Sequence, residues 1–471
     1  MVLPPAKHRR SAVAASAVQS RNKTVDLLET CRLVHALLTK DFCDQVFAST
    51  RLNERQRVWS LHALATFWTG VILESPVSLT EAVEDAVRAG LFQLCDKPPS
   101  PQGFFDRAKS LKWIFFAEMF DQFVAAITPQ GLPLFASEFA FLRQHFAEVW
   151  VLDGSRLDAV SHRLKILWNV RSAVLPGCLM AAYDLFRGYP RALRFDADAA
   201  RGEIPRATEL LDQVPPGTLL IMDRGFTGVQ FFEELNRRKV YGLCRMKKGL
   251  KVCMVEALQK RQILGRPLED WLVDVGSGKK TPAQRLRLIT WRCGKDVFKL
   301  LTNVLDPTKL SAEVALDLYR KRWSVERMYF DLKEVFNLNQ FYASNPNGVA
   351  MQVYAAAIVY VAMRVAQGRA AQHAHVEPED ISTAKFFPRM ATAYATHSGF
   401  EVGYQATCDA NPGVELKKPD PTGHPRFTAN LKDILVHPRS GVRRKRRYCE
   451  GRKKWKSFAH IPGAKSLMKL T

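Results

Sequence analysis

The sequence lacks the cysteine patterns of a disulfide framework or a zinc site. Its nine cysteines are scattered through 471 residues, with no CxxC pair and no spacing typical of metal ligands. A structural zinc centre and a disulfide-stapled secreted fold are therefore not expected. The pattern is typical of reduced thiols in a cytoplasmic protein.

Long apolar runs are also lacking. The most apolar stretches are TFWTGVIL, residues 66–73, and VYAAAIVYVAM, residues 353–363. Both are shorter than the roughly 18 to 20 residues that a membrane-spanning helix needs. The first residues, MVLPPAKHRRSAVAASAV, contain a basic patch but no continuous apolar segment, so no secretory signal is predicted.

Acidic residues are few relative to basic ones. Lys and Arg total 69 against 46 Asp and Glu, which gives a net charge of +23. These positive charges are spread along the whole chain, and they repel one another unless a polyanion neutralises them. Nucleic acid is the first candidate partner and an anionic membrane the second. The membrane is the poorer of the two, because the basic residues do not gather on one amphipathic helix.

The hydrophobic content of 47% is ample for globular packing, and the length predicts roughly two to four structural units. Residues 1–147 are predicted to form a helical N-terminal domain, because apolar positions recur at helical spacing from about Thr24. Residues 148–370 alternate strands and helices, with a hairpin around FRGYP, which predicts an α/β domain with a mixed sheet. A β-rich insertion, residues 248–304, interrupts that domain.

The remaining part, residues 371–471, is predicted to be a basic region of helix and loop, richer in loop than the rest. Near its end is the basic run RRKRRYCEGRKKWKS, residues 443–457, and the interleaved Tyr448 and Trp455 favour contact with a DNA backbone over a merely solvated tail.

Two aspartates follow apolar strands in the predicted α/β domain. Asp153 ends the strand VWVL before Gly154, and Asp223 ends the strand TLLIM before a glycine turn. In open α/β sheets, working residues lie beyond the carboxyl ends of strands. Either residue alone could be an ordinary loop aspartate. Two carboxylates at neighbouring strand ends of a basic protein predict a Mg²⁺ site.

The stretch YRKRWSVERMYFDLK lies in a helix predicted from Ala312 to about Val335. At about 100° per residue, Tyr319, Arg322, Glu326 and Lys333 fall within an arc of roughly 60° on one face. One interpretation is a surface ladder of ion pairs, since Arg322 and Glu326 are four residues apart. The other is a third metal carboxylate, Glu326, flanked by groups that hold phosphates.

The segments VLDGS, MDRGF and Y-x2-R-x3-E-x6-K resemble the catalytic segments of bacterial insertion-sequence transposases of the DDE type. The similarity is to the branch named for its YREK signature, the IS-four family, and covers residues 148–333. It implies a ribonuclease-H-like fold with a β insertion between the second and third acids. It also implies metal-dependent cleavage of the element ends and their transfer to target DNA, with a hairpin intermediate.

The resemblance assigns roles to residues of this chain. Asp153, Asp223 and Glu326 would be the catalytic acids and bind two Mg²⁺ ions, for which Mn²⁺ can substitute. Tyr319, Arg322 and Lys333 would hold phosphates near the cleavage point.

Two further residues have a role that the resemblance leaves open. Phe298 lies where relatives stack an aromatic ring on a flipped base, although a core role in the insertion fits equally well. Arg224 is either a phosphate contact or a surface arginine.

The expected partner is double-stranded DNA, comprising the terminal inverted repeats and the target, bound by a homodimer in the cytoplasm at the nucleoid. Two alternatives stay open. One is a metal-dependent nuclease or resolvase on the same fold, which cuts without joining. The other is a non-catalytic DNA-binding protein derived from a transposase, which the presence of all three acids disfavours.

Overall fold

The computed structural model describes residues 24–50, 54–55, 57–89, 100–128, 131–132, 134–157, 177–199, 201–263, 265–276, 283–293, 296–338, 340–343, 345–410 and 425–436. The basic run near the C-terminus lies outside them. The described chain packs as two compact units, which are taken separately below. Unit 1 holds the residues up to Thr218 and those from Lys321 to Val436, and unit 2 holds Leu219–Arg320. The domain boundaries expected from the sequence stay a prediction.

The first part of unit 1 is helical, as predicted. Its helices are α2 (Glu29–Leu37), α3 (Lys40–Thr50), α4 (Leu61–Glu74), α5 (Leu79–Ala89), α6 (Pro101–Ser110) and α7 (Ile114–Ile127), followed by a 3-10 segment, Ser137–Gln144. Serine side chains cap several of them; Ser60 accepts a hydrogen bond from Ala63 N, for example. One expectation is wrong: Thr24–Asp26 is a strand, β1, because it pairs antiparallel with β11 (Thr428–Asn430).

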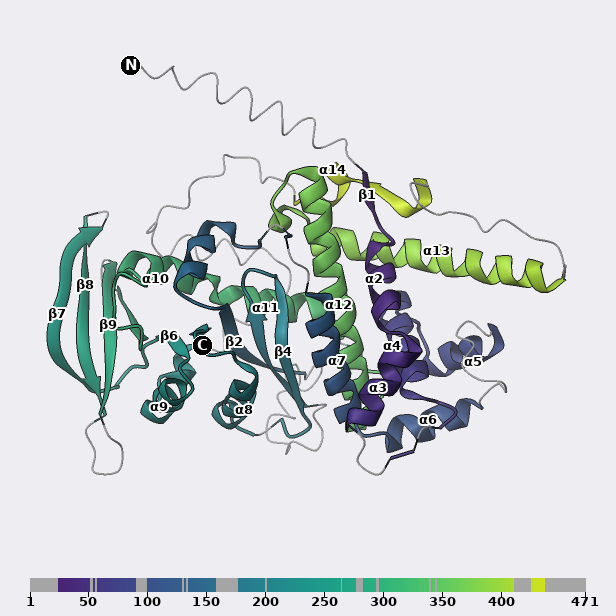
Figure 1. Ribbon diagram of the computed structural model, residues 1–471, viewed down its shortest axis with the longest axis horizontal. Coiled ribbons are helices and arrows are strands. Elements are labelled where there is room, and N and C mark those ends of the chain that lie inside the picture. The colour runs from purple at the N-terminus through teal and green to yellow at the C-terminus, as the bar shows by residue number, and fades with distance from the viewer. Residues whose placement is uncertain are drawn as a thin grey trace, which may run out of the picture. The chain divides into compact units, whose positions relative to one another are not determined.

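Helix α12 (Pro346–Ala374) forms the centre of unit 1. Asn345 caps it and Pro346 opens it. It packs against α2, α4 and α7, beside which it runs in Figure 1. The helix extends beyond the apolar run seen in the sequence and is long and apolar enough to cross a membrane, yet its most apolar window is completely buried inside the protein. It is therefore packed as a core helix.

Unit 1 also contains an antiparallel sheet in the order β4-β3-β2. Its strands are β2 (Val149–Arg156), β3 (Cys178–Asp184) and β4 (Tyr189–Asp196). The hairpin predicted around FRGYP is β3–β4, and Gly188 in its turn has φ +76° with the Phe135 ring packed against its Cα. Helix α8 (Glu203–Leu210) follows, as predicted.

Unit 2 contains a mixed sheet in the order β5-β6-β10-β9-β8-β7. Strands β5 (Leu219–Met222) and β6 (Tyr241–Arg245) are parallel and joined by helix α9 (Val229–Arg237). The predicted β-rich insertion forms β7 (Val252–Ile263), β8 (Arg266–Val275), β9 (Gln284–Cys293) and β10 (Asp296–Thr302). Because β10 pairs with β6, these strands extend the sheet. The predicted α/β class with a mixed sheet is confirmed.

The helix predicted from Ala312 to about Val335 is confirmed, and every residue of it is helical, although its hydrogen bonding changes along the way. It consists of α10 (Ala312–Tyr319), a 3-10 turn (Arg320–Arg322), α11 (Trp323–Phe330) and a π turn (Asp331–Val335). The region expected to mix helix and loop contains α13 (Thr383–Ala410), which continues through Pro388, and the short α14 (Leu431–Ile434).

Candidate active site

Asp153 lies within strand β2 of unit 1. The sequence predicts that the strand stops there, but β2 continues to Arg156 because β3 provides main-chain partners for these residues, with Asp153 opposite Ala181. Val149–Leu152 are buried, so the strand is anchored in the core. The Asp153 carboxylate accepts a hydrogen bond from the Gly154 N–H at 2.9 Å. The acid is therefore held on a rigid element.

Arg322 joins Asp153 to Glu326. Its guanidinium lies 2.6 Å from Glu326 Oε1 and 3.4 Å from Asp153 Oδ2. The side chains of Arg322 and Asp153 are 10% and 16% exposed, and that of Glu326 is 36% exposed. Two of the predicted acids thus converge on one positive charge. Hard carboxylate oxygens in this arrangement suit a divalent cation such as Mg²⁺.

Unit 1 alone does not provide all the carboxylates of the predicted metal site. Within the described part of the chain, no three His, Cys, Asp or Glu side chains are grouped so as to hold a metal ion. Asp153 and Glu326 both contact Arg322 instead. These two residues fit part of a metal site, and a further carboxylate is needed to complete the predicted set.

The pKa of Asp153 is raised from 3.8 to about 7. Burial is the largest cause, and the neighbouring carboxylates of Glu326 and Glu203 add to it, while Arg322 and the Gly154 N–H oppose it. A buried carboxyl with like charges nearby resists ionisation. A cation at this position would favour the charged form.

Lys333 lies on the π turn after α11 and binds β2. Its Nζ donates to Ser155 Oγ at 2.8 Å and to the Arg156 carbonyl at 2.7 Å. Two of its N–H donors therefore stabilise the strand that carries Asp153. The residues of the predicted helical face lie on turns of three different geometries, α, 3-10 and π.

Tyr329 is a site residue that the sequence analysis did not identify. It is buried on α11, and its hydroxyl donates a hydrogen bond to the Asp153 carbonyl oxygen at 2.9 Å. On the sequence it is indistinguishable from an aromatic core residue at helical spacing. Its contact depends on the tertiary packing of α11 on β2 and β3.

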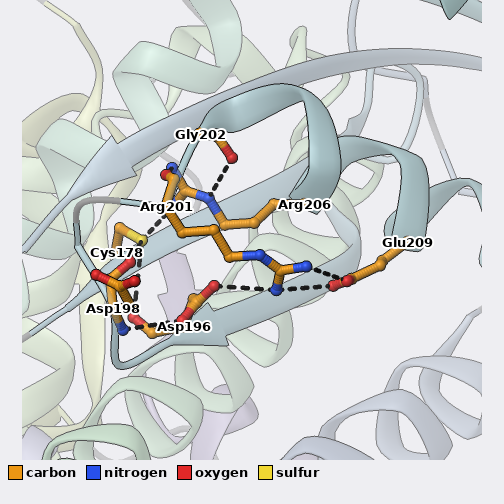
Figure 2. A network of polar contacts seen from close by, with 7 residues as sticks. All are labelled: Cys178, Asp196, Asp198, Arg201, Gly202, Arg206 and Glu209. Carbon is orange, nitrogen blue, oxygen red and sulfur yellow. Dashed lines mark hydrogen bonds and ion pairs between the residues drawn. The ribbon is translucent and has the colours of Figure 1, made fainter.

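Glu203 is a second residue that the sequence analysis missed. It opens α8, and its Oε1 lies 3.3 Å from where a Cβ on Gly154 would be. Figure 2 shows what holds this end of α8: Arg206 reaches the Cys178 thiol of β3 and the carbonyls of Arg201 and Gly202. The carboxylate is thereby kept beside β2.

Arg201 adds the other half of the network drawn in Figure 2. It lies between Asp196 at the end of β4, at 3.3 Å, and Glu209 of α8. The network ties α8 to the hairpin on both sides. In the sequence, Glu203 could have been noticed only as an acidic residue that follows a glycine at the start of a predicted helix.

In unit 2, Asp223 lies directly after the buried strand β5, as predicted. It is half-buried, and its main-chain carbonyl accepts a hydrogen bond from Phe226 N at 3.2 Å. Arg224 is exposed in the turn that follows. The acid therefore has the local setting expected of a residue beyond a strand end.

Phe298 and Tyr319 meet in unit 2. Their ring centroids are 5.7 Å apart in an edge-to-face arrangement, and Arg245 of β6 lies 5.2 Å from the centre of the Phe298 ring. Phe298 is half-buried and Tyr319 buried. The structure thus places Tyr319 with Phe298, and Arg322, Glu326 and Lys333 with Asp153.

Comparison with known proteins identifies the segment that carries these residues. Residues 148–362 match the family model described as the transposase DDE domain. A protein named as a transposase for insertion sequence element IS4SA, from Synechocystis sp., is 24% identical over 48% of this chain and 62% of its own length. The transposase y4zB of Sinorhizobium fredii is 28% identical over 47% of this chain and 67% of its own length.

A transposase for insertion sequence element IS5377, from Geobacillus stearothermophilus, is 23% identical over 36% of this chain and 45% of its own length. The chain thus matches about two thirds or less of each of these relatives. Among solved structures, a piggyBac transposase synaptic complex with hairpin DNA is similar over 92% of both chains, with 14% identity and a TM-score of 0.38. That score is too low to establish a shared fold.

Proposed function

Because residues 148–362 match the family model described as the transposase DDE domain and the chain is similar to proteins named as insertion-sequence transposases, we propose that it is a DNA transposase. It cuts the ends of an insertion sequence and transfers them to target DNA by metal-dependent phosphoryl transfer. The observation that carries the proposal is the convergence of Asp153 and Glu326, from β2 and α11, on Arg322 within the matched segment.

The proposed catalytic set is Asp153, Glu326 and Asp223, on a ribonuclease-H-like core. These carboxylates would hold two Mg²⁺ ions, which would supply activation of the attacking water or 3′-hydroxyl and stabilisation of the leaving 3′ oxygen. The carboxylates orient the site, and burial of Asp153 excludes water from one side of it. Support for Asp223 is its place after β5 in the matched segment.

The basic residues of the site handle the DNA backbone in this proposal. Arg322, which contacts the carboxylates of Asp153 and Glu326, would bind a phosphate of the DNA. Lys333 reaches the same strand of the duplex from its position beside Ser155. Arg224 is exposed and has the reach of a phosphate contact.

Phe298 and Tyr319 are proposed to act on the flanking strand. The edge of the Phe298 ring packs with Tyr319, and Arg245 supplies a cation near the ring face. Such a group stacks on an unpaired base, as resolution through a hairpin requires. The active form is a homodimer on two DNA ends, located at the nucleoid.

The test is strand cleavage of a labelled duplex that carries the terminal inverted repeat flanking this reading frame, in Mg²⁺. Native protein should nick the end and join it to target DNA, whereas Glu326→Gln should bind the duplex without cutting it. Glu334→Gln, an exposed acid in the same segment, serves as the matched control and should cut normally.

Each other outcome assigns a different function to this protein. Cutting without joining assigns a nuclease or resolvase on the same fold. Binding without cutting by the native protein assigns a non-catalytic descendant, and the roles of the three acids are then withdrawn. Normal cutting by Glu326→Gln removes Glu326 from the catalytic set.

A further inference from the structure

Tyr329 connects the two carboxylate-bearing elements of unit 1 through one hydroxyl group. That hydroxyl donates to the Asp153 carbonyl at 2.9 Å. Asp153 faces Ala181 in the β2–β3 register. The tyrosine of α11 therefore binds β2 at the residue that carries the acid.

The contact fixes the main chain rather than the carboxylate itself. An aspartate side chain has only two rotatable bonds, so the position of its oxygens follows closely from that of its backbone. Helix α11 also carries Glu326, three residues before Tyr329, on the same rigid stretch. This hydrogen bond thus joins the main chain at Asp153 directly to the helix that carries Glu326, alongside the ion pairs of Arg322.

The hydrogen bond between Tyr329 and Asp153 is buried, so its loss is expected to affect the position of β2. Tyr329 is 5% exposed, and Asp153 is the first residue of β2 after the buried run Val149–Leu152. Loss of the hydroxyl leaves the Asp153 carbonyl without its side-chain donor, and β2 can move relative to α11. Lys333 holds Ser155 and Arg156 two residues further on, so movement would centre on Asp153.

We propose that Tyr329 is a positioning residue of the active site, whose hydroxyl holds Asp153 at the distance from Glu326 that a divalent cation requires. The inference rests on the proposed function for its catalytic meaning. A residue that only filled the core would contribute through its ring, which a phenylalanine retains. The hydroxyl group is therefore the part to remove.

The matched pair of variants is Tyr329→Phe and Tyr354→Phe. Tyr354 is equally buried in unit 1, and its hydroxyl bonds with the Phe195 N–H at 3.2 Å and the Leu193 carbonyl at 3.5 Å, away from β2. Each variant loses a buried hydroxyl that hydrogen-bonds to the backbone. A purely structural effect should therefore appear in both.

Three measurements separate the possibilities. Mn²⁺ binding is followed by calorimetry without DNA, amide hydrogen exchange is followed in peptides containing Asp153 and Ala181, and cleavage of the inverted-repeat duplex is followed in Mg²⁺. In Tyr329→Phe, Mn²⁺ affinity and kcat should each fall about tenfold or more, with the KM for DNA unchanged. Exchange should quicken in β2 and β3. Tyr354→Phe should match native protein in all three.

Contrary results are distinct from a failure of the proposed function. If native protein binds Mn²⁺ and cuts DNA, and Tyr329→Phe does so equally well, Tyr329 has no positioning role. Equal losses in both variants, or a Tyr329→Phe protein that does not fold, assign a structural role and overturn the inference. If native protein neither binds Mn²⁺ nor cuts, the proposed function itself fails.

Discussion

Asp331 offers a test of the electrostatics in the π turn that follows α11. It is 2% exposed, and burial, as the largest cause, raises its pKa from 3.8 to about 6. Arg327, whose Nε lies 3.4 Å from Asp331 Oδ1, opposes that shift, as do Arg364 and the Thr383 hydroxyl. Replacement by Asn keeps the size of the side chain and removes the charge.

The expected effect depends on pH. Because the folded pKa lies above the unfolded one, the stabilising contribution is fully present below about pH 4 and is lost as pH rises through about 6. A shift of roughly two units corresponds to about 3 kcal/mol at pH 8. Asp331→Asn should therefore be more stable than native protein at pH 8 by up to about that amount, with a much smaller gap near pH 4.

Thermal unfolding followed by tryptophan fluorescence measures this directly. At pH 8 the midpoint of the variant should lie roughly 2–5 °C above that of native protein. Glu334→Gln removes an exposed carboxylate from the same segment and should shift the midpoint little at either pH. An Asp331→Asn variant that is less stable at pH 8, or a gap that does not grow with pH, would refute the reasoning.

Three further predictions concern the site and unit 2. Arg322→Gln removes the charge that competes with a cation, so Mn²⁺ affinity measured without DNA should rise severalfold; an unchanged or weaker affinity contradicts this. Asp270→Asn leaves Arg287 buried without its counter-charge, so differential scanning calorimetry should show a loss of roughly 3 kcal/mol or more, and a smaller loss counts against it. Phe298→Ala should leave the first nick intact and reduce hairpin products on sequencing gels, whereas a slower first nick would place Phe298 elsewhere in the reaction.

The parts of the fold that follow from short-range signals were predictable. The β3–β4 hairpin turns through residues 185–188, with Gly188 last, between apolar runs, and β5 ends at Met222, directly before Asp223 and a glycine turn. Strand β2 shows the limit of such signals. Gly154 reads as a turn, yet the strand continues because β3, more than twenty residues later in the chain, provides its hydrogen-bond partners. Likewise, no proline or glycine marks the 3-10 and π turns within the helical run from Ala312 to Val335.

The candidate site was predictable to a similar extent. Asp153, Arg322 and Glu326 were identified from residue type and spacing, and the structure brings them together. Glu203 and Tyr329 were missed because their roles come from packing: one depends on an arginine network at the start of α8 and the other on α11 lying over β2 and β3. Neither arrangement produces a periodic pattern that could be recognised in the sequence.

Helix α12 has a consequence for how the chain is made. Its partners α2, α4 and α7 all precede it, the last ending at Ile127, while α12 ends at Ala374. At a synthesis rate of 5–20 residues per second, α12 is completed roughly 10 to 50 s after α7, and during that time the apolar faces that α12 covers are exposed. Nascent and truncated chains should therefore aggregate readily, and chaperones that bind exposed apolar surface should determine how much of this protein a cell accumulates.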